Sequence, residues 1–455
     1  MSEEFDMTGE TLRLAEYAAG FKFSDIPAHV VQYAKNAIAD GIGACVFSYD
    51  LPWSKFPINY AQRYGSGGKS YILGLTGARV QAPQAAFANG AMAHVFELDA
   101  GTRPSTGAHP YATIFPALLA TAQEQGGAGR DVLAAFVAAT EVMLRIGLAT
   151  KLSNSHRGFH SAGTTGPFGA AVAVGRLLGF GKSTMASAIG AAGSLSSGLV
   201  QFSKSSTGAM TKCLHFGRAA ESGVLAARLA GGGFESPHDI VEGEYGFLRA
   251  FCDEYDLSEL TRDLGEKFLT LMIYTKRFCC HGSAQYPLAA LETILGEHRI
   301  SIDDIAEIDV TGAEERVHRQ NIMNPPDLMK AQYSVPFCVA LAFVRNLRDP
   351  RSFDETALRD TQIRSLVSRV NYHASTEPRE MANKGSTVTI TMKSGAVLRQ
   401  SAYSFKGLPS SPADKDDVYE RYSILTRHCP KSRMDEVFER IQNLENEANV
   451  DWLHA

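Results

Sequence analysis

The first half of the chain alternates apolar stretches at helical spacing with short connections that contain Gly, Ser, Asn or Pro. This pattern predicts helix after helix. Thr8 is placed to cap the first helix, which ends before Gly20, and Pro27 suits the first turn of the second. The expected helices are 8–19, 27–47, 82–98, 110–124, 130–150, 163–178, 183–202 and 211–229. No alternating strand pattern of useful length precedes about Ile305, so this half is expected to be all-α.

The pattern changes near residues 268–276. Two strand-like runs follow, at 307–310 and 387–392, and the second alternates Thr with Val or Ile. A turn at 393–395 leads into another strand at 396–402, which indicates a hairpin. Helical patterns lie between the strand-like runs, at 285–295 and 334–345. This part is expected to be a smaller α+β domain.

After the Pro-Ser-Ser-Pro breaker at 409–412, polar amphipathic helices are expected at 417–426 and 433–447. The predicted fold class is therefore mainly α. A helical domain is expected at 1–267, an α+β domain at 268–408, and C-terminal helices at 409–455 that return to the helical domain.

The composition is that of a soluble globular protein, with 455 residues, 45% hydrophobic and 20% charged. No stretch approaches 18 consecutive apolar residues, so no membrane partner is expected. The first residues lack the basic and apolar regions of a signal peptide, which favours a cytoplasmic protein. The net charge of −5, without a basic run interleaved with aromatic residues, argues against nucleic acid as a partner. The seven cysteines are odd in number and contain no C-x-x-C, which favours reduced thiols over disulfides, a zinc ribbon or an iron–sulfur site.

One charge pattern stands apart. Residues 142–220 contain no Asp or Glu, but they contain eight Lys or Arg and three His. The other residues there are mostly small, which lets helices approach closely. A local positive field concentrates small anions, so this run predicts a pocket for a small polycarboxylate.

Within the run, His160 precedes an expected helix, where free backbone N–H groups suit a carboxylate. His156 and His160 have the spacing of metal ligands, but the next acid is Glu221. No metal is therefore expected. Lys212 falls in the first turn of a helix, where a bound anion would offset its unfavourable position. The alternatives are a structural, hydrogen-bonded His160 and a Lys212 that extends to solvent.

Two further groups lie outside the run. Lys276 and Arg277 are adjacent cations that could hold carboxylates, or could form a basic pair on the surface. His94, Glu97 and Asp99 end an apolar helix, shortly before His109. Such acids and histidines can transfer protons or orient catalytic groups, although a solvated helix end is the plainer interpretation.

Five blocks in order resemble the MmgE/PrpD family, which contains 2-methylcitrate dehydratase, cis-aconitate decarboxylase and iminodisuccinate epimerase. The blocks are 90–99 with His109-Pro110, 158–166, 211–226, 276–280 and 331–337. The resemblance spans about residues 12–406. It implies a large helical domain built from both chain ends, a smaller α+β lid, a homodimer, and a site in the cleft between the domains that needs no cofactor.

The resemblance assigns catalytic roles to four residues, His109, His160, Lys212 and Lys276. The expected substrate-binding residues around them are Glu97, Asp99, Thr102, His215, Arg277 and Tyr333. The chain departs from the usual family pattern at four positions, where Glu97 replaces Asp, Ala100 replaces Asp, Phe337 replaces Tyr and Gln285 replaces His.

These residues suit the removal of a proton beside a carboxylate, because cations lower the energy of the enolate and a histidine can carry the proton. The leading hypothesis is a lyase that dehydrates a 2-methylcitrate-like hydroxy acid. Decarboxylation of the cis-aconitate type and epimerisation of the iminodisuccinate type need the same groups. A non-catalytic carboxylate-binding homologue is the alternative from another class, because family membership does not guarantee activity.

Overall fold

The computed structural model describes residues 9–74, 79–205, 210–378, 382–383 and 385–454. The chain divides into two compact units. Unit 1 contains residues 1–95, 99–274 and 414–455, and unit 2 contains residues 96–98 and 275–413. These divisions lie near the expected ones at 267 and 408, but the short segment 96–98 also belongs to unit 2. Thr8, the expected first cap, lies outside the described residues.

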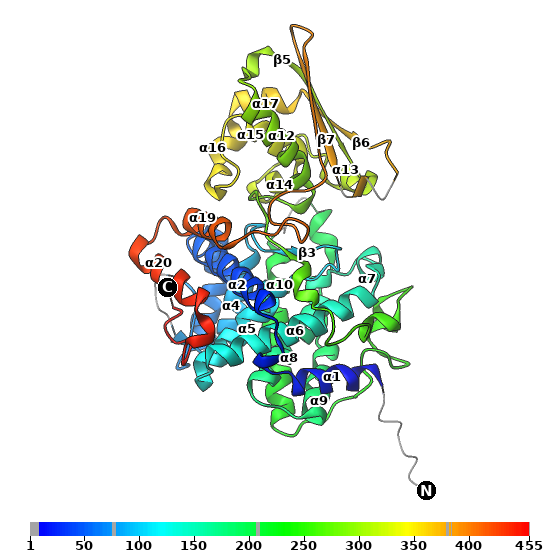
Figure 1. Ribbon diagram of the computed structural model, residues 1–455, viewed down its shortest axis with the longest axis vertical. Helices are drawn as coiled ribbons and strands as arrows, with labels where there is room; N and C mark the ends of the chain where they lie inside the picture. The colour runs from blue at the N-terminus through cyan, green and yellow to red at the C-terminus, as the bar shows by residue number, and fades with distance from the viewer. Residues whose placement is uncertain (1–8, 75–78, 206–209, 379–381, 384, 455) are drawn as a thin grey trace. The chain divides into compact units, whose positions relative to one another are not determined.

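Unit 1 is a bundle of helices with two very short β-ladders (Figure 1). Its α-helices are α1 (Glu10–Gly20), α2 (Ala28–Ser48), α3 (Lys55–Tyr64), α4 (Ala82–His94), α5 (Pro110–Gln125), α6 (Gly129–Ala149), α7 (Ser153–His156), α8 (Ser161–Leu177), α9 (Lys182–Ser194), α10 (Thr211–Gly231), α11 (Phe247–Phe251), α19 (Lys415–Thr426) and α20 (Lys431–Gln442). The ladders pair β1 (Ser70–Tyr71) with β2 (Arg79–Val80), and β3 (Gly101–Thr102) with β4 (Ile273–Tyr274). The predominantly helical character is confirmed, whereas α3 and the two ladders were not expected.

Small residues bring α10 close to α4 and α8. A Cβ added to Gly217 would lie 2.5 Å from the carbonyl oxygen of Phe87 on α4, and one added to Gly223 would lie 2.2 Å from Cβ of Ala170 on α8. Both distances are far below van der Waals contact, so only glycine permits this packing. The abundance of small residues in the acid-free run thus has a structural cause: it sets the depth of α10 within unit 1.

Two of the predicted helices end earlier in the structure than the sequence pattern indicates. The helix predicted to end at Leu98 ends at His94, and Glu97 beyond it has a positive φ of 48°. The helix predicted over 183–202 ends at Ser194. The following residues turn back to the start of α8, where Ser197 donates its N–H to Gly163 O at 3.1 Å. Gly198 accepts from the N–H of His160 at 3.0 Å, and its φ of 117° suits glycine. A short 3-10 turn follows at Val200–Ser203.

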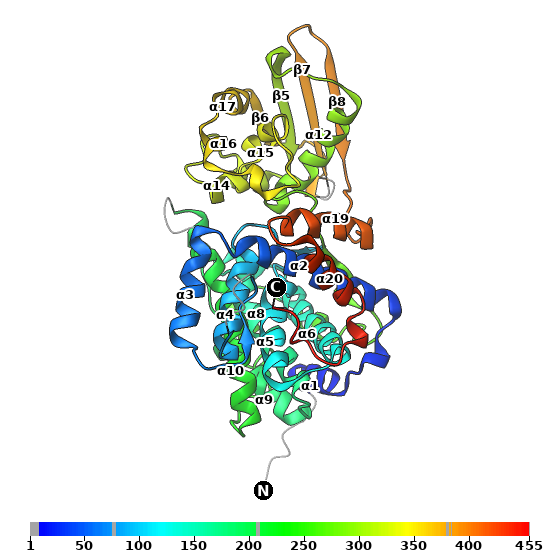
Figure 2. The ribbon, with the colours of Figure 1, turned by 90° about the vertical axis from the view of Figure 1, so that its left-hand side faces the viewer.

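Unit 2 has a four-stranded sheet in the order β6-β5-β7-β8 (Figure 2). Its strands are β5 (Ile305–Gly312), β6 (Val370–Ala374), β7 (Ser386–Met392) and β8 (Val397–Ala402). β5 and β6 are parallel, whereas β7 is antiparallel to β5 and to β8. The predicted hairpin of β7 and β8 is confirmed, and β6 was not expected.

Unit 2 also contains α-helices. They are α12 (Gln285–Glu297), α13 (Glu314–Gln320), α14 (Leu328–Tyr333), α15 (Val335–Ala342), α16 (Glu355–Arg359) and α17 (Thr361–Val367). α12 contacts β7 and β8, and α15 contacts β6. Ile308, Val310, Val388 and Ile390 are fully buried and alternate along their strands with more exposed residues, as expected for a sheet with one covered face.

α6 has the length and composition of a helix that could cross a membrane. Within unit 1, 94% of its apolar window is buried, and it packs against α8 and α5. A buried core helix meets the same criteria of length and hydropathy, so this feature is weak support for a membrane span.

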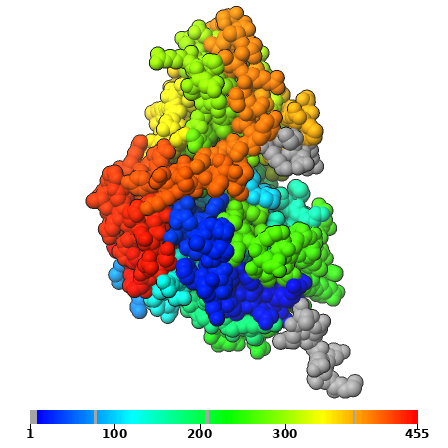
Figure 3. Space-filling view, in the orientation of Figure 1, coloured from blue at the N-terminus to red at the C-terminus, as the bar shows by residue number. Residues whose placement is uncertain are grey.

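The C-terminal helices belong to unit 1 and are held by buried charged groups. Arg421 on α19 donates from Nε to Asp40 on α2 at 2.5 Å, and both side chains are almost completely buried. Lys35 on α2 donates to Gln442 O at 2.8 Å and to Glu445 at 3.0 Å. In Figure 3 the red C-terminal segment borders the blue N-terminal segment on the viewed face of unit 1.

We expect the change Arg421→Ala to lower the free energy of unfolding by about 3 kcal/mol, because it leaves the buried Asp40 carboxylate without its guanidinium. The control is Lys431→Ala, which removes an exposed ion pair with Asp435 within α20 and should cost less than about 1 kcal/mol. Urea unfolding at pH 7 measures both. Equal losses in the two variants would contradict the structural role of the buried pair.

Candidate active site

A buried carboxylate joins two histidines at the end of α4. Asp99 accepts from Nδ1 of His94 through one oxygen and from Nδ1 of His109 through the other, the second bond measuring 2.7 Å. His94 is the last residue of α4, and His109 is the N-cap residue of α5. The side chains of His94 and Asp99 are fully buried, whereas that of His109 is 20% exposed. These bonds place a proton on Nδ1 of each ring and direct Nε2 of His109 away from Asp99.

The charges in this group depend on one another. Burial alone would raise the pKa of Asp99, but the charges and hydrogen bonds of His94 and His109 hold it well below its usual range. Burial is also the largest influence on His109 and lowers its pKa, although Asp99 acts in the opposite direction. Asp99 therefore remains an anion and favours the charged form of His109.

A second group of bases comes from α8 and α10. His160 is the N-cap residue of α8, and its Nδ1 lies 2.9 Å from Nδ1 of His215 on α10. Lys212 is buried one turn before His215 on the same helix. Because burial and the charge of Lys212 both disfavour an imidazolium, the pKa of His160 is lowered well below its ordinary value. Burial, His94 and Lys212 lower the pKa of His215 to about 4.

The ring of Phe216 lies between the two groups. It stacks on His94 with centroids 3.8 Å apart, and it meets His109 and His160 edge to face at 5.2 and 5.5 Å. Lys212, His215 and Phe216 follow the i, i+3, i+4 spacing of one helix face. That spacing was the available signal for Phe216, which sequence reasoning missed. These contacts bring His109, His160, Lys212, Asp99 and His215 together within unit 1.

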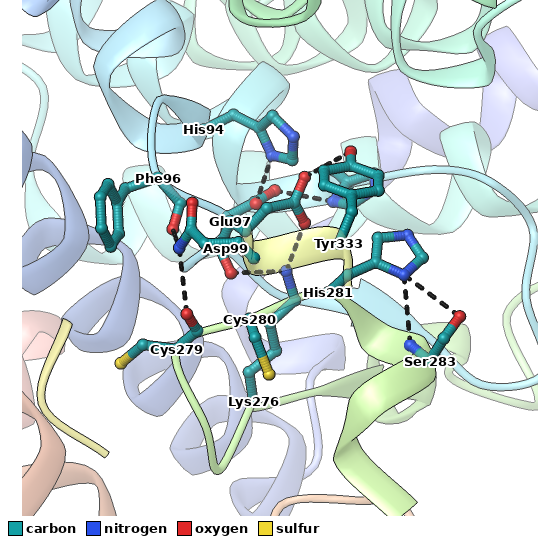
Figure 4. Close-up of polar contacts among 12 residues, drawn as sticks. His94, Phe96, Glu97, Asp99, Lys276, Cys279, Cys280, His281, Ser283 and Tyr333 are labelled. Carbon is teal, nitrogen blue, oxygen red and sulfur yellow. Dashed lines mark hydrogen bonds and ion pairs between the residues drawn. The ribbon is translucent and has the colours of Figure 1, made fainter. Parts of the chain in front are cut away.

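Unit 2 holds Lys276 in a group of its own (Figure 4). Its Nζ donates to the backbone oxygen of Glu97 at 2.7 Å and to the Glu97 carboxylate at 3.1 Å. Tyr333 donates its hydroxyl to the other carboxylate oxygen at 2.7 Å and stacks on His281. Gln332 fixes the backbone on both sides by donating to the carbonyl groups of Phe96 and Cys279, each at 3.0 Å. Sequence reasoning missed His281 and Gln332, although Gln332 precedes Tyr333 directly.

Several expected site residues have structural contacts instead. Arg277 pairs with Glu292 at 2.8 Å, and the same carboxylate binds Arg348. The hydroxyl groups of Thr102 and Thr106 form a hydrogen bond of 2.9 Å, and the Thr102 hydroxyl also accepts from the backbone N–H of Thr106. These contacts favour roles in holding loops rather than substrate.

Gln285 and Phe337, two of the departures from the usual family pattern, are both buried. Gln285 is fully buried and accepts from the N–H groups of Arg277 and Phe278 while it donates to Phe278 O and Cys280 O. It therefore holds the loop that follows Lys276. Phe337 is buried at the start of α15 near Phe353.

Among the residues that the structure describes, His94, Asp99 and His109 could hold a metal ion, because one ligand atom of each lies within 4.8 Å of the others. The distances fit hydrogen bonds better. Two ligands about 2.1 Å from a tetrahedral zinc ion lie about 3.4 Å apart, whereas the nitrogen of His109 and the oxygen of Asp99 are separated by 2.7 Å. The chemistry of this group is that of a carboxylate between two imidazoles.

Most cations of the acid-free run are neutralised by acids from other parts of the chain. Ion pairs join Arg145 to Glu141, Lys151 to Glu254, Arg157 to Asp253, Lys182 to Glu16 and Arg218 to Glu221. Arg176 donates to Phe21 O. Lys212 lies beside the histidines, where its charge lowers the pKa of His160 and of His215.

Comparison with known proteins gives a consistent assignment. A model of the MmgE/PrpD N-terminal domain matches residues 12–260, and a model of the MmgE/PrpD C-terminal domain matches residues 278–445. A cis-aconitate decarboxylase of Aspergillus terreus is 26% identical over 98% of this chain and 95% of its own length. A cis-aconitate decarboxylase-like protein of Aspergillus oryzae is 26% identical over 98% and 96%, and the human cis-aconitate decarboxylase is 24% identical over 94% and 90%.

The buried Asp99 makes a testable contribution to stability. We expect Asp99→Asn to lower the free energy of unfolding at pH 7 by about 2–3 kcal/mol. An amide has one acceptor oxygen, whereas the N–H groups of His94 and His109 each need an acceptor. Since the pKa of Asp99 is depressed in the folded protein, this stabilisation is complete above the pKa of an unfolded Asp, about 3.9, and is lost as the pH falls below it.

The difference between the wild type and Asp99→Asn should therefore narrow as the pH falls from about 5 towards 3. Urea titrations across this range measure it, with exposed Asp303→Asn as the control. A difference that stays constant with pH would show that the charge of Asp99 is not responsible.

Proposed function

Because the chain belongs to the MmgE/PrpD family, we propose that it is a lyase that decarboxylates a small unsaturated polycarboxylate of the cis-aconitate type. Two observations support this choice over the dehydration that the sequence alone favoured. Relatives that cover nearly the whole chain are named cis-aconitate decarboxylases. The arrangement that carries the chemistry is the Asp99–His109 pair, a proton donor next to a carboxylate, in the same unit as the buried Lys212.

In the proposed reaction, Lys212 binds a carboxylate that the substrate retains, and the N-terminal end of α8 adds partial positive charge beside it. The carbon–carbon bond to the leaving carboxylate breaks and releases CO₂. The electron pair of that bond forms a new carbon–carbon double bond, and the pair of the original double bond moves towards the retained carboxylate, where Lys212 stabilises the developing charge. His109 then delivers one proton from Nε2 to carbon, and it regains a proton from solvent before the next turnover.

Asp99 fits the role of a positioning residue for the donor. It holds the ring of His109 through Nδ1 and favours the imidazolium form, which is the form that can give up a proton. Lys276 has an anionic partner in Glu97, so its charge is partly offset within unit 2. That Lys276 contacts substrate stays a prediction.

Dehydration is the second candidate, and one observation favours it. His109 and His160 have opposite kinds of Nδ1 partner, an anion and a neutral ring, so one suits the acid and the other the base. Dehydration beside a carboxylate needs both an acid and a base, whereas decarboxylation needs only the acid. Epimerisation would need proton exchange without loss of CO₂ or water.

A turnover screen with cis-aconitate, 2-methylcitrate, citrate and iminodisuccinate tests these proposals. We expect CO₂ release from cis-aconitate, with one deuterium incorporated into the product in D₂O. We expect Lys212→Met to lower kcat/KM at least about 100-fold, because it removes a charge that stabilises the transition state. The exposed Lys204→Met, from the same acid-free run, is the matched control and should retain full activity.

Water loss without CO₂ would favour the dehydratase, and deuterium exchange with unchanged substrate would favour the epimerase. If calorimetry detects binding of these compounds but none is turned over, the non-catalytic carboxylate-binding homologue is favoured. Full activity of Lys212→Met on the accepted substrate would contradict the proposed role of that lysine.

We also propose that the protein is a homodimer, paired through the outer face of α10. Leu214, Leu225 and Leu229 are each more than 40% exposed, and they lie on one stripe with Arg218 and Glu221. Phe56, Tyr60 and Tyr64 extend this apolar surface along α3. Trp53, Phe56, Tyr60 and Leu214 line a pocket on the same face.

The charges on the stripe favour a second copy as the occupant. An antiparallel pairing of two α10 helices about a two-fold axis between residues 219 and 220 sets Arg218 opposite the partner's Glu221 and Leu214 opposite the partner's Leu225. Arg218 and Glu221 already form an ion pair within one chain, so the same charges can be shared between two copies.

We expect the double change Leu225→Asp and Leu229→Asp to convert the dimer into a folded monomer, because it buries four carboxylates in the interface. Light scattering after size exclusion measures the mass against 49.2 kDa for one chain. The control is the double change Val397→Asp and Tyr403→Asp in unit 2, which replaces exposed apolar residues outside the stripe. A monomeric wild type would reject the dimer.

A further inference from the structure

His215 was expected to bind substrate, but its contacts suggest a different role. We propose that His215 is a positioning residue for His160: the bond between their Nδ1 atoms occupies that nitrogen of His160, leaves Nε2 as its only nitrogen for substrate, and limits the two rings to one positive charge. The role of His215 in catalysis rests on the proposed function. The hydrogen bond between the two rings and the limit of one positive charge do not depend on the substrate.

The bond between His160 and His215 limits how many protons the two rings hold. A hydrogen bond of 2.9 Å between two Nδ1 atoms holds one proton, with one ring as donor and the other as acceptor. If both Nδ1 atoms carried protons, two N–H groups would point at each other. The rings can therefore be neutral together or share one extra proton, but they cannot both be imidazolium in this arrangement.

His160 stands at the start of α8. As the N-cap residue of α8 it could accept from the first N–H groups of that helix, yet its side chain makes no capping bond. Its Nδ1 instead meets His215. Both rings lie near helix N-termini, where the partial positive charge disfavours a cation.

The loop after α9 holds both residues in place. Gly198 accepts the backbone N–H of His160 at 3.0 Å. A Cβ on Gly198 would lie 3.2 Å from the ring of His215, and its φ of 117° suits only glycine. Phe202 meets both rings edge to face, at 5.3 Å from His160 and 5.9 Å from His215. The same short segment therefore sets the backbone of one histidine and the ring of the other.

The charged and titratable groups that act on the rings come from three helices. Lys212 lies on α10, His94 ends α4 and His109 begins α5, and Asp99 binds the last two. When His160 takes a proton on Nε2, its Nδ1–H can donate to the neutral ring of His215. His215 thus serves His160 as Asp99 serves His109, but without a negative charge, so His160 stays the weaker base and remains neutral at pH 7.

The test compares His215→Asn with His215→Phe. Asparagine retains a hydrogen-bonding atom at the δ position, whereas phenylalanine retains the ring and loses both nitrogens. We expect His215→Phe to lower kcat about 10-fold to 100-fold with KM changed less than about 3-fold, and His215→Asn to stay within about 3-fold of the wild type. Because the imidazolium of His160 loses its acceptor, the acidic limb of kcat/KM should move to lower pH in His215→Phe only.

A measurement without substrate separates this proposal from the proposed function. In protein labelled at Cε1 of histidine, His160→Asn and His215→Asn assign the two signals. We expect the signals of His160 and His215 to respond together to the uptake of one proton, and the His160 midpoint to fall in His215→Phe. Thermal unfolding of each variant checks that it is folded.

The proposal is overturned if the two histidines each take up a proton independently, or if His160 titrates in the same way in His215→Phe as in the wild type. Equal losses of kcat in the Asn and Phe variants would also reject it, because packing rather than the hydrogen bond would then matter. The protein could show coupled titration of His160 and His215 and yet turn over none of the screened compounds. That result would support this proposal and reject only the proposed reaction.

Discussion

The close approach of α10 to α4 and α8 is the constraint on which the candidate site depends. Gly217 and Gly223 let the backbone of α10 reach contact distances that a single methyl group would prevent. Only at this depth can Phe216 touch His94, His109 and His160 together. The site is therefore built by small residues first and by its charged residues second, since the glycines decide where Lys212 and His215 project.

The two histidine groups show how one fold separates the properties of two identical side chains. His109 and His160 are both partly buried bases near Lys212, and loss of solvation lowers the pKa of each. They differ in what Nδ1 meets, a carboxylate in one case and an imidazole in the other. An anionic partner stabilises the imidazolium, whereas a neutral partner only accepts a hydrogen bond. The two rings thus differ through the residue that each Nδ1 meets.

Sequence patterns predicted what depends on local periodicity. The long helices of unit 1 and the β7–β8 hairpin followed from apolar spacing and turn residues, and the family assignment followed from ordered motifs. Helix ends were less predictable. Leu195, Leu199 and Phe202 continue the apolar spacing of a helix after Ser194, but this segment bonds to the start of α8 instead, at Gly163 and His160. The partners of a backbone N–H in such a loop are distant in sequence, so no local pattern reveals them.

The acid-free run illustrates the same limit for charge. Its composition correctly indicated an unusual region, but a count of cations could not tell which of them keep an effective charge. Arg145, Lys151 and Lys182 meet carboxylates from outside the run, at 2.6, 2.8 and 2.9 Å. Lys212 lies among histidines, where its effect is to lower the pKa of their rings. A lysine that disfavours protonation of its neighbours also attracts an anion, because both effects arise from the same positive charge. A bound carboxylate would therefore raise the pKa of those same histidines, so that substrate binding itself prepares them to carry a proton.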